Sequence, residues 1–180
     1  RSLAAAMARA RFATCCAWPR ACDSARSTAA TTIWARFSRI RFAQGSLAAL
    51  KAFDARETQQ GAVFHYASPQ TVVLTLLLRA VTGMSLSDYL TPRLWQPMGA
   101  EADATWVRTR DGTEAGSGNF NAILRDYGRL GMLLANDGAV DGKQVIPKDY
   151  LLEATDWHRQ PDNFKPLLAT PFFGYGYQFW

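Results

Sequence analysis

The sequence contains few of the residues that build metal centres or disulfide frameworks. It has three cysteines, Cys15, Cys16 and Cys22, and all three lie near the amino end. Its two histidines, His65 and His158, do not stand at a spacing that would complete a zinc site with these cysteines. We therefore expect neither a metal site nor a disulfide framework.

Long apolar runs are also missing. The run TVVLTLLLRAVTG, at residues 71–83, is interrupted by Arg79 and closed by Gly83. A membrane-spanning helix needs about 20 consecutive and predominantly apolar residues. The sequence therefore predicts no membrane span.

Acidic residues are nearly absent from the first 45 positions. This segment has one acid, Asp23, no lysine and eight arginines, so its charge is +7, whereas residues 46–180 carry −2. Three interpretations stay open: a transit peptide rich in Arg and Ser, a basic arm that contacts phosphates, or translation of a GC-rich gene in another reading frame. We expect a boundary here, between an atypical segment at 1–45 and a domain at 46–180.

What the remainder does contain is a set of helix boundaries marked by capping residues. The chain has 180 residues, of which 48% are hydrophobic, which is enough to bury a core. Ser68 followed by Pro69 predicts a helix start, because serine accepts backbone N–H bonds and proline fits the first turn. Gly83 predicts the end of that helix. Ser85 with Asp88 three residues later resembles a capping box and predicts a second, short helix.

Three further helices are predicted, and the segments around them are expected to be loops or a strand. The helices are expected at about 46–55, at about 123–134 with Asn121 as its cap, and from Pro147 to about Thr155. The third is the most regular, since apolar residues at 123, 127, 130 and 134 share one face and Arg125, Asp126 and Arg129 share the other. Residues 101–121 are expected to be loop-rich, and FFGYGYQFW at 172–180 to begin a strand.

Tyr66 and Ser68 stand directly before the predicted helix start, in HYASPQT. The backbone donors and the dipole of a helix N-terminus favour a nearby negative charge, which would include a tyrosinate. Two residues apart in an extended segment, both side chains could face one cleft. The same residues also fit an ordinary core aromatic followed by an ordinary helix cap.

The order of these features resembles the serine β-lactamase and penicillin-binding-protein superfamily, in particular its class C-like esterases and 6-aminohexanoate-oligomer hydrolases. The resemblance covers residues 46–180, and NAILRDYGRLGMLLANDGAVDGKQVIP at 121–147 is its most specific part. It implies an α+β chain with a partial β-lactamase-like fold, mostly the helical region, and with the start of a sheet strand at the C-terminus. It also implies hydrolysis of a small amide or ester through an acyl-serine, with no metal or organic cofactor and no nucleic-acid partner.

In this superfamily three motifs build the site: Ser-x-x-Lys with the nucleophile, Tyr-x-Asn or Tyr-x-Ser, and a Lys-Thr-Gly or His-x-Gly triplet on a sheet strand. Tyr66-Ala67-Ser68 matches the second motif. The resemblance assigns proton transfer to Tyr66 and hydrogen bonding to Ser68. Asn119, Asn121 and Trp106 are further candidates for substrate binding, although Asn121 is equally suited to capping and Trp106 to the core.

The first motif is absent, because no serine of the chain has a lysine three positions later, and the third is expected beyond Trp180. A tyrosine with an ordinary pKa near 10 is ionised to only about one part in a thousand at pH 7, so Tyr66 would lack the cation that activates it. We therefore expect this polypeptide to be inactive and to expose a face that the complete fold would bury. The alternative is a non-catalytic helical remnant with a basic arm for an acidic partner. The compartment stays open between cytoplasm and periplasm.

Overall fold

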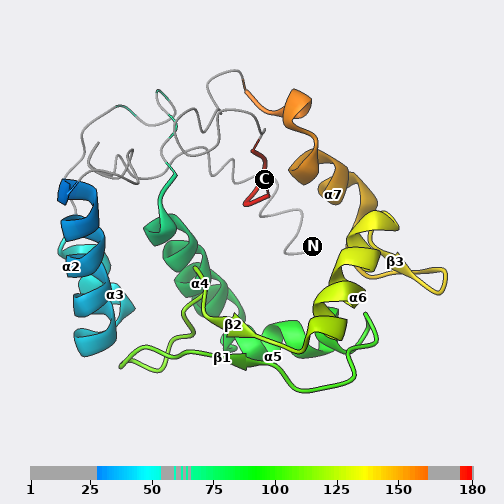
Figure 1. Cartoon of the computed structure of the whole chain (residues 1–180), viewed down its shortest axis with the longest axis horizontal. Coiled ribbons are helices and arrows are strands. Elements are labelled where there is room, and N and C mark those ends of the chain that lie inside the picture. The colour runs from blue at the N-terminus through cyan, green and yellow to red at the C-terminus, as the bar shows by residue number, and fades with distance from the viewer. Residues whose placement is uncertain are drawn as a thin grey trace. The chain divides into compact units, whose positions relative to one another are not determined.

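The computed structural model describes residues 28–53, 59, 62, 64, 66–161 and 175–179, apart from the side chains of residues 28–32 and Trp157. The chain divides into two compact units. One unit comprises Arg1–Trp34, Asp54–Ala67 and Asp149–Trp180, and the other comprises Ala35–Phe53 and Ser68–Lys148. Figure 1 shows the elements in chain order. The three cysteines and His65, which bear on the metal and disulfide predictions, lie outside the described residues.

Two helices of the described residues precede the predicted Tyr-x-Ser motif. They are α2 (Thr28–Gln44) and α3 (Ser46–Lys51). The chain turns between them at Gly45, whose φ of 108° favours glycine. The rings of Phe37 and Phe53 meet edge to face with centroids 5.9 Å apart, and Phe37 and Ala49 are fully buried. The helix predicted at 46–55 therefore exists but ends at Lys51, and α2 lies within the segment of unusual composition.

Helix α4 (Ser68–Thr82) and the short helix after it follow the capping signals closely. Gly83 ends α4 with a φ of 68° and donates its N–H to the Arg79 carbonyl at 2.9 Å. Helix α5 (Leu86–Leu90) has Ser85 as its N-cap, and the serine hydroxyl both accepts from the Asp88 N–H at 3.0 Å and donates to the Asp88 carboxylate at 2.6 Å. The helical path then continues through a π-helical turn, η2 (Thr91–Trp95), because Pro92 occupies its first turn, where no donor is needed.

The segment predicted to be loop-rich is a hairpin. Strand β1 (Thr105–Trp106) pairs antiparallel with β2 (Phe120–Asn121), and an isolated bridge joins Arg108 to Glu114. A second hairpin joins β3 (Ala139–Val140) to β4 (Lys143–Gln144). Its turn residues Asp141 and Gly142 have φ of 48° and 76°, which is the mirror-image turn that Asp-Gly favours.

Helix α6 (Leu124–Ala135) has the predicted length but a different buried face. Its fully buried residues are Asp126 and Leu133, whereas Ile123 and Tyr127 are 40% and 42% exposed. The prediction that Asp126 lies on the solvent side is therefore wrong, because its carboxylate satisfies backbone donors of a neighbouring loop. Asn121 is not the cap of this helix, since it pairs in β2 and Ile123 occupies the N-cap position.

The last described elements are α7 (Lys148–Thr155), as predicted from Pro147, and the 3-10 turn η3 (Trp157–Arg159). Residues 175–179 bend, with the Gly176 N–H donating to the Phe179 carbonyl at 3.0 Å. A paired strand is not formed by these five residues, and the rest of the strand predicted at 172–180 lies outside the described part of the chain.

Candidate active site

Ser68 is the first residue of α4, one position later than an N-cap, and its side chain is half-buried. One residue is the usual scatter in helix ends. The residues that follow it anchor the helix, since Pro69, Val72 and Thr75 are buried. Ser68 thus stands at a fixed helix start, where backbone N–H groups are unpaired within the helix.

The loop between β1 and β2 packs closely on α4. A Cβ on Gly116 would lie 2.0 Å from the Thr75 hydroxyl, so only glycine allows this approach. Arg79 of α4 donates to the Thr113 hydroxyl at 3.1 Å, and the buried Arg41 of α2 donates to the Ser117 hydroxyl at 2.8 Å. The Gly116-Ser117-Gly118 turn is therefore fixed against two helices of the same unit.

Trp106, Asn119 and Asn121 all belong to this hairpin. The Trp106 Nε1 donates to the carbonyls of Ala115 and Gly118, at 3.2 and 2.9 Å, and its ring lies 4.8 Å from that of Phe120. Asn119 has a φ of 59° and is exposed, and its carbonyl accepts from the Asn121 side chain at 3.3 Å. The structure thus brings these three candidates together, with Trp106 closing the loop and both asparagines exposed.

Tyr66 belongs to the other compact unit. Its side chain is 44% exposed, and its ring meets that of Tyr175 edge to face, with centroids 6.0 Å apart and an interplanar angle of 88°. Tyr175 also contacts Phe64 at 5.2 Å and is only 5% exposed. Tyr66 therefore rests on a buried aromatic neighbour while much of its own ring stays accessible.

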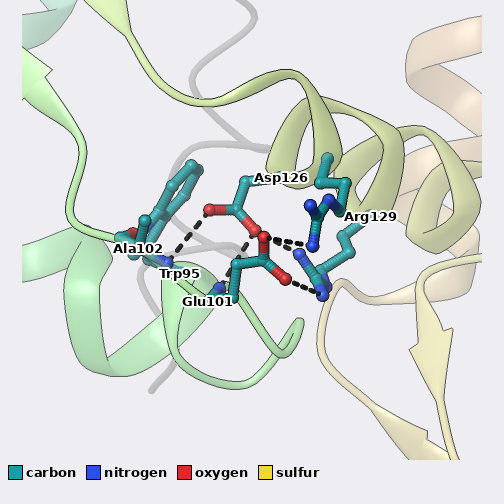
Figure 2. Close-up of polar contacts among 6 residues, drawn as sticks. Trp95, Glu101, Ala102, Asp126 and Arg129 are labelled. Carbon is teal, nitrogen blue, oxygen red and sulfur yellow. Dashed lines mark hydrogen bonds and ion pairs between the residues drawn. The ribbon is translucent and has the colours of Figure 1, made fainter.

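Sequence reasoning missed a fully buried carboxylate that accepts three hydrogen bonds, which is shown in Figure 2. Asp126 is fully buried, and its oxygens accept from the backbone N–H of Glu101 at 3.0 Å and of Ala102 at 3.2 Å. Arg129 donates to Asp126 at 2.7 Å and to Glu101 at 2.7 Å. Next to this network, Trp95 donates its Nε1 to the Ala102 carbonyl at 2.9 Å. Asp126 thus fixes the loop that leads into β1.

The pKa of Asp126 lies below its ordinary value. Burial alone would raise the pKa, but the hydrogen bonds from the Glu101 N–H, from Arg129 and from the Ala102 N–H outweigh burial. One signal could have revealed this residue: positions 126, 130 and 133 fall at i, i+4 and i+7, so Asp126 shares the stripe of two leucines.

Asp111 is a second carboxylate that accepts backbone N–H groups, in this case at the start of α3. It accepts from the Ser46 N–H at 2.8 Å, from the Thr109 hydroxyl at 2.6 Å and from the Thr113 N–H at 3.2 Å. Burial would raise the pKa of Asp111, but these hydrogen bonds, led by that of Thr109, lower it. A carboxylate from the hairpin therefore does what a side-chain cap would do for α3, whose N-cap residue is Gly45.

Neither metal ligands nor a straight membrane helix emerge from the described residues. Among them, no three His, Cys, Asp or Glu side chains gather as a metal site would require. No single described helix is long and apolar enough to cross a membrane. Helix α4 and the segment formed by α5 and η2 are together long and apolar enough to cross a membrane, but the angle between these two parts is 72°.

Two known hydrolases resemble the chain. A curated 6-aminohexanoate-dimer hydrolase of Paenarthrobacter ureafaciens is 28% identical over 88 residues, which is 49% of this chain and 22% of that enzyme. A solved structure from Bacillus anthracis, named for a proposed 6-aminohexanoate-dimer hydrolase activity, is 33% identical with a TM-score of 0.57 and covers 62% of this chain. The match covers 28% of that protein, so the chain spans about a quarter of the length of these relatives.

A family comparison extends over most of the chain. Residues 27–180 match the model of the Beta-lactamase family, and the match includes α2 as well as the Tyr-x-Ser motif. The helices with short antiparallel strands are consistent with a partial α+β fold of that family, as the sequence predicts. The match, together with the names of both relatives, supports homology to hydrolases. The chain belongs to the β-lactamase family.

Proposed function

We propose that the chain carries one part of the active site of a hydrolase that cleaves a small amide or ester through an acyl-serine intermediate. The observation that carries this proposal is the Tyr66-Ala67-Ser68 motif, which lies within the matched range and ends at Ser68, the first residue of α4. The names of both relatives denote hydrolases of a linear amide, which supports an amide as the substrate class. The reaction needs no metal or organic cofactor.

Tyr66 is the proposed proton-transfer residue. Tyr66 is 44% exposed, and we assign to its hydroxyl group the exchange of a proton with a substrate or with water. In the complete site the lysine of a Ser-x-x-Lys motif would supply the cation that such a tyrosine needs. Ser68 would donate or accept a hydrogen bond at the same site.

Asn119 and Asn121 are proposed as polar contacts to the substrate, and Trp106 as the residue that holds their loop. Both asparagines are exposed on one hairpin, whereas the Trp106 indole is bound to two carbonyls of that hairpin. Replacing Trp106 should therefore affect the loop as a whole. Replacing an asparagine should lower substrate affinity.

The 180-residue polypeptide should have no acyl-transfer activity of its own, because its sequence contains no Ser-x-x-Lys. We expect turnover of a nitrophenyl ester at the rate of buffer, and no adduct mass after incubation with a fluorophosphonate. The Paenarthrobacter enzyme serves as the positive control. Ester turnover above buffer that survives a further purification step would refute this expectation.

The proposal as a whole is tested by sequencing the encoding DNA across residues 1–45 and upstream, and translating all three frames. The expected result is a Ser-x-x-Lys in one frame, some tens of residues before Lys51, and the same data test the proposed boundary near residue 45. The protein translated with that motif should hydrolyse esters, and Tyr66→Phe should lower its kcat by about 10²- to 10⁴-fold. If no frame encodes the motif, the hydrolase proposal fails.

A further inference from the structure

We propose that Tyr175 is a positioning residue that holds the ring of Tyr66 in a single orientation. This inference rests on the proposed function, because it gives Tyr66 the proton-transfer role. Tyr175 lies over a hundred residues after Tyr66 in the sequence, yet both belong to the same compact unit.

The ring contacts make Tyr175 the centre of a small aromatic cluster with Phe64 and Tyr66. Tyr175 is 5% exposed, and it meets Tyr66 and Phe64 edge to face, at 6.0 and 5.2 Å. This arrangement is favoured because the positive edge of one ring faces the negative face of the other. A proton-transfer group must be held within hydrogen-bond reach of its partner atoms.

Tyr175 is itself held by the two residues that follow it. A Cβ on Gly176 would lie 1.8 Å from the carbonyl oxygen of Ala154 in α7, so this approach requires glycine. The Tyr177 hydroxyl donates to the Glu153 carboxylate at 2.5 Å, and the Tyr177 ring stacks on Tyr150 with centroids 6.1 Å apart. The Tyr-Gly-Tyr sequence is thus anchored on α7, and its first tyrosine is aimed at Tyr66.

The ionisation behaviour of Tyr175 agrees with a role in placement rather than in chemistry. Burial raises the pKa of Tyr175 well above its ordinary value, and the nearby Tyr66 raises it further. Tyr175 therefore stays a neutral phenol at pH 7 and does not serve as a base there.

The test reads the order of the Tyr66 side chain in the 180-residue chain by NMR. Wild-type protein should show Hα–Hβ couplings of a single Tyr66 rotamer and cross-peaks between the rings of residues 66 and 175. Tyr175→Phe should retain both features, whereas Tyr175→Leu should give averaged couplings. Averaged couplings in the wild type, or a single rotamer in Tyr175→Leu, would overturn the positioning role.

A second variant moves the Tyr175 ring without removing it. Gly176→Ala forces the chain away from Ala154 and should abolish the cross-peaks and average the Tyr66 couplings. The matched control is Gly128→Ala, since a Cβ there meets no atom within 4 Å. Unchanged Tyr66 couplings in a folded Gly176→Ala protein would contradict the proposal.

The NMR measurements do not depend on enzyme activity. They can therefore disprove the positioning role of Tyr175 independently of the proposed function. In the protein with the Ser-x-x-Lys motif, Tyr175→Leu should lower kcat about tenfold or more with little change in KM, and Tyr175→Phe should restore it. If Tyr66 is ordered by Tyr175 but Tyr66→Phe leaves kcat unchanged, the proton-transfer role is wrong. If kcat depends on Tyr66 but not on residue 175, the positioning role is wrong.

Discussion

Different interactions stabilise two regions of the molecule. One is the hairpin region, which comprises the β1–β2 hairpin with α3 and α6, and the other is the Tyr66–Tyr175 cluster. In the hairpin region, carboxylates of Asp126 and Asp111 accept backbone N–H groups from segments far away in the sequence. In the cluster, aromatic rings pack edge to face and a glycine allows two backbone segments to meet. A buried carboxylate fixes a loop rigidly but depends on its charge, whereas ring packing does not depend on pH.

The largest effect should come from Asp126→Asn, which breaks the hairpin side of this comparison. The amide places a donor where the carboxylate accepts three bonds, and it leaves Arg129 without its buried partner. We expect Tm to fall by roughly 10 °C, measured by circular dichroism. Asp141→Asn is the control, because Asp141 is exposed with a φ of 48° that asparagine also adopts. Equal Tm values for the two variants would show that the network contributes nothing.

Low pH should destabilise the hairpin region more than the aromatic cluster, without any mutation. The pKa values of Asp126, Asp111 and Glu114 are lowered in the folded chain by hydrogen bonds that outweigh the opposing effect of burial. Their contribution to stability is therefore complete above the ordinary carboxyl pKa of about 4 and is lost as the pH falls through the lower folded values. Hydrogen exchange between pH 6 and pH 3 should show protection lost first in α3 and α6, while the Tyr66–Tyr175 cross-peaks persist. Simultaneous loss would mean that the two regions are not independent.

A smaller effect is expected in the aromatic region from Tyr177→Phe. The change removes the hydrogen bond to Glu153 and keeps the ring stacked on Tyr150. We expect the free energy of unfolding to fall by about 1 kcal/mol in urea titrations. Tyr89→Phe is the control. The guanidinium of Arg93 lies over the Tyr89 ring, and phenylalanine keeps this contact, so the free energy of unfolding should change little. A larger fall for Tyr89→Phe would contradict the assignment of this bond.

The smallest effect has the opposite sign and lies in α6. Gly128 is in the interior of this helix, and a Cβ there would meet no atom within 4 Å. Alanine reduces the backbone freedom of the unfolded chain, so Gly128→Ala should raise the free energy of unfolding by about 0.5–1 kcal/mol. The urea midpoint measures the change. An unchanged or lower midpoint would show that this face of α6 is in closer contact than the described residues indicate.

Much of the helical framework could be predicted from local patterns. The starts near Ser68 and at Ser85, and the end at Gly83, were predicted from residues within one turn of the boundary. The hairpin at residues 105–121 was predicted only as a loop, because two-residue strands leave no alternating pattern. The boundary near residue 45 stays a prediction, and both α2 and the family match begin before it.

The sequence by itself determined, to within a residue or two, where α4, α6 and α7 begin and end, and which family the chain resembles. Caps, turns and helical periods act through hydrogen bonds and side chains only a few residues apart, so they can be recognised in one segment at a time. Only the tertiary structure decided that Asp126 is buried, that Asp111 serves α3, and that Tyr175 lies against Tyr66. Each of these contacts joins segments far apart in the chain, and the energy of such a contact depends on where the intervening backbone brings its partners together.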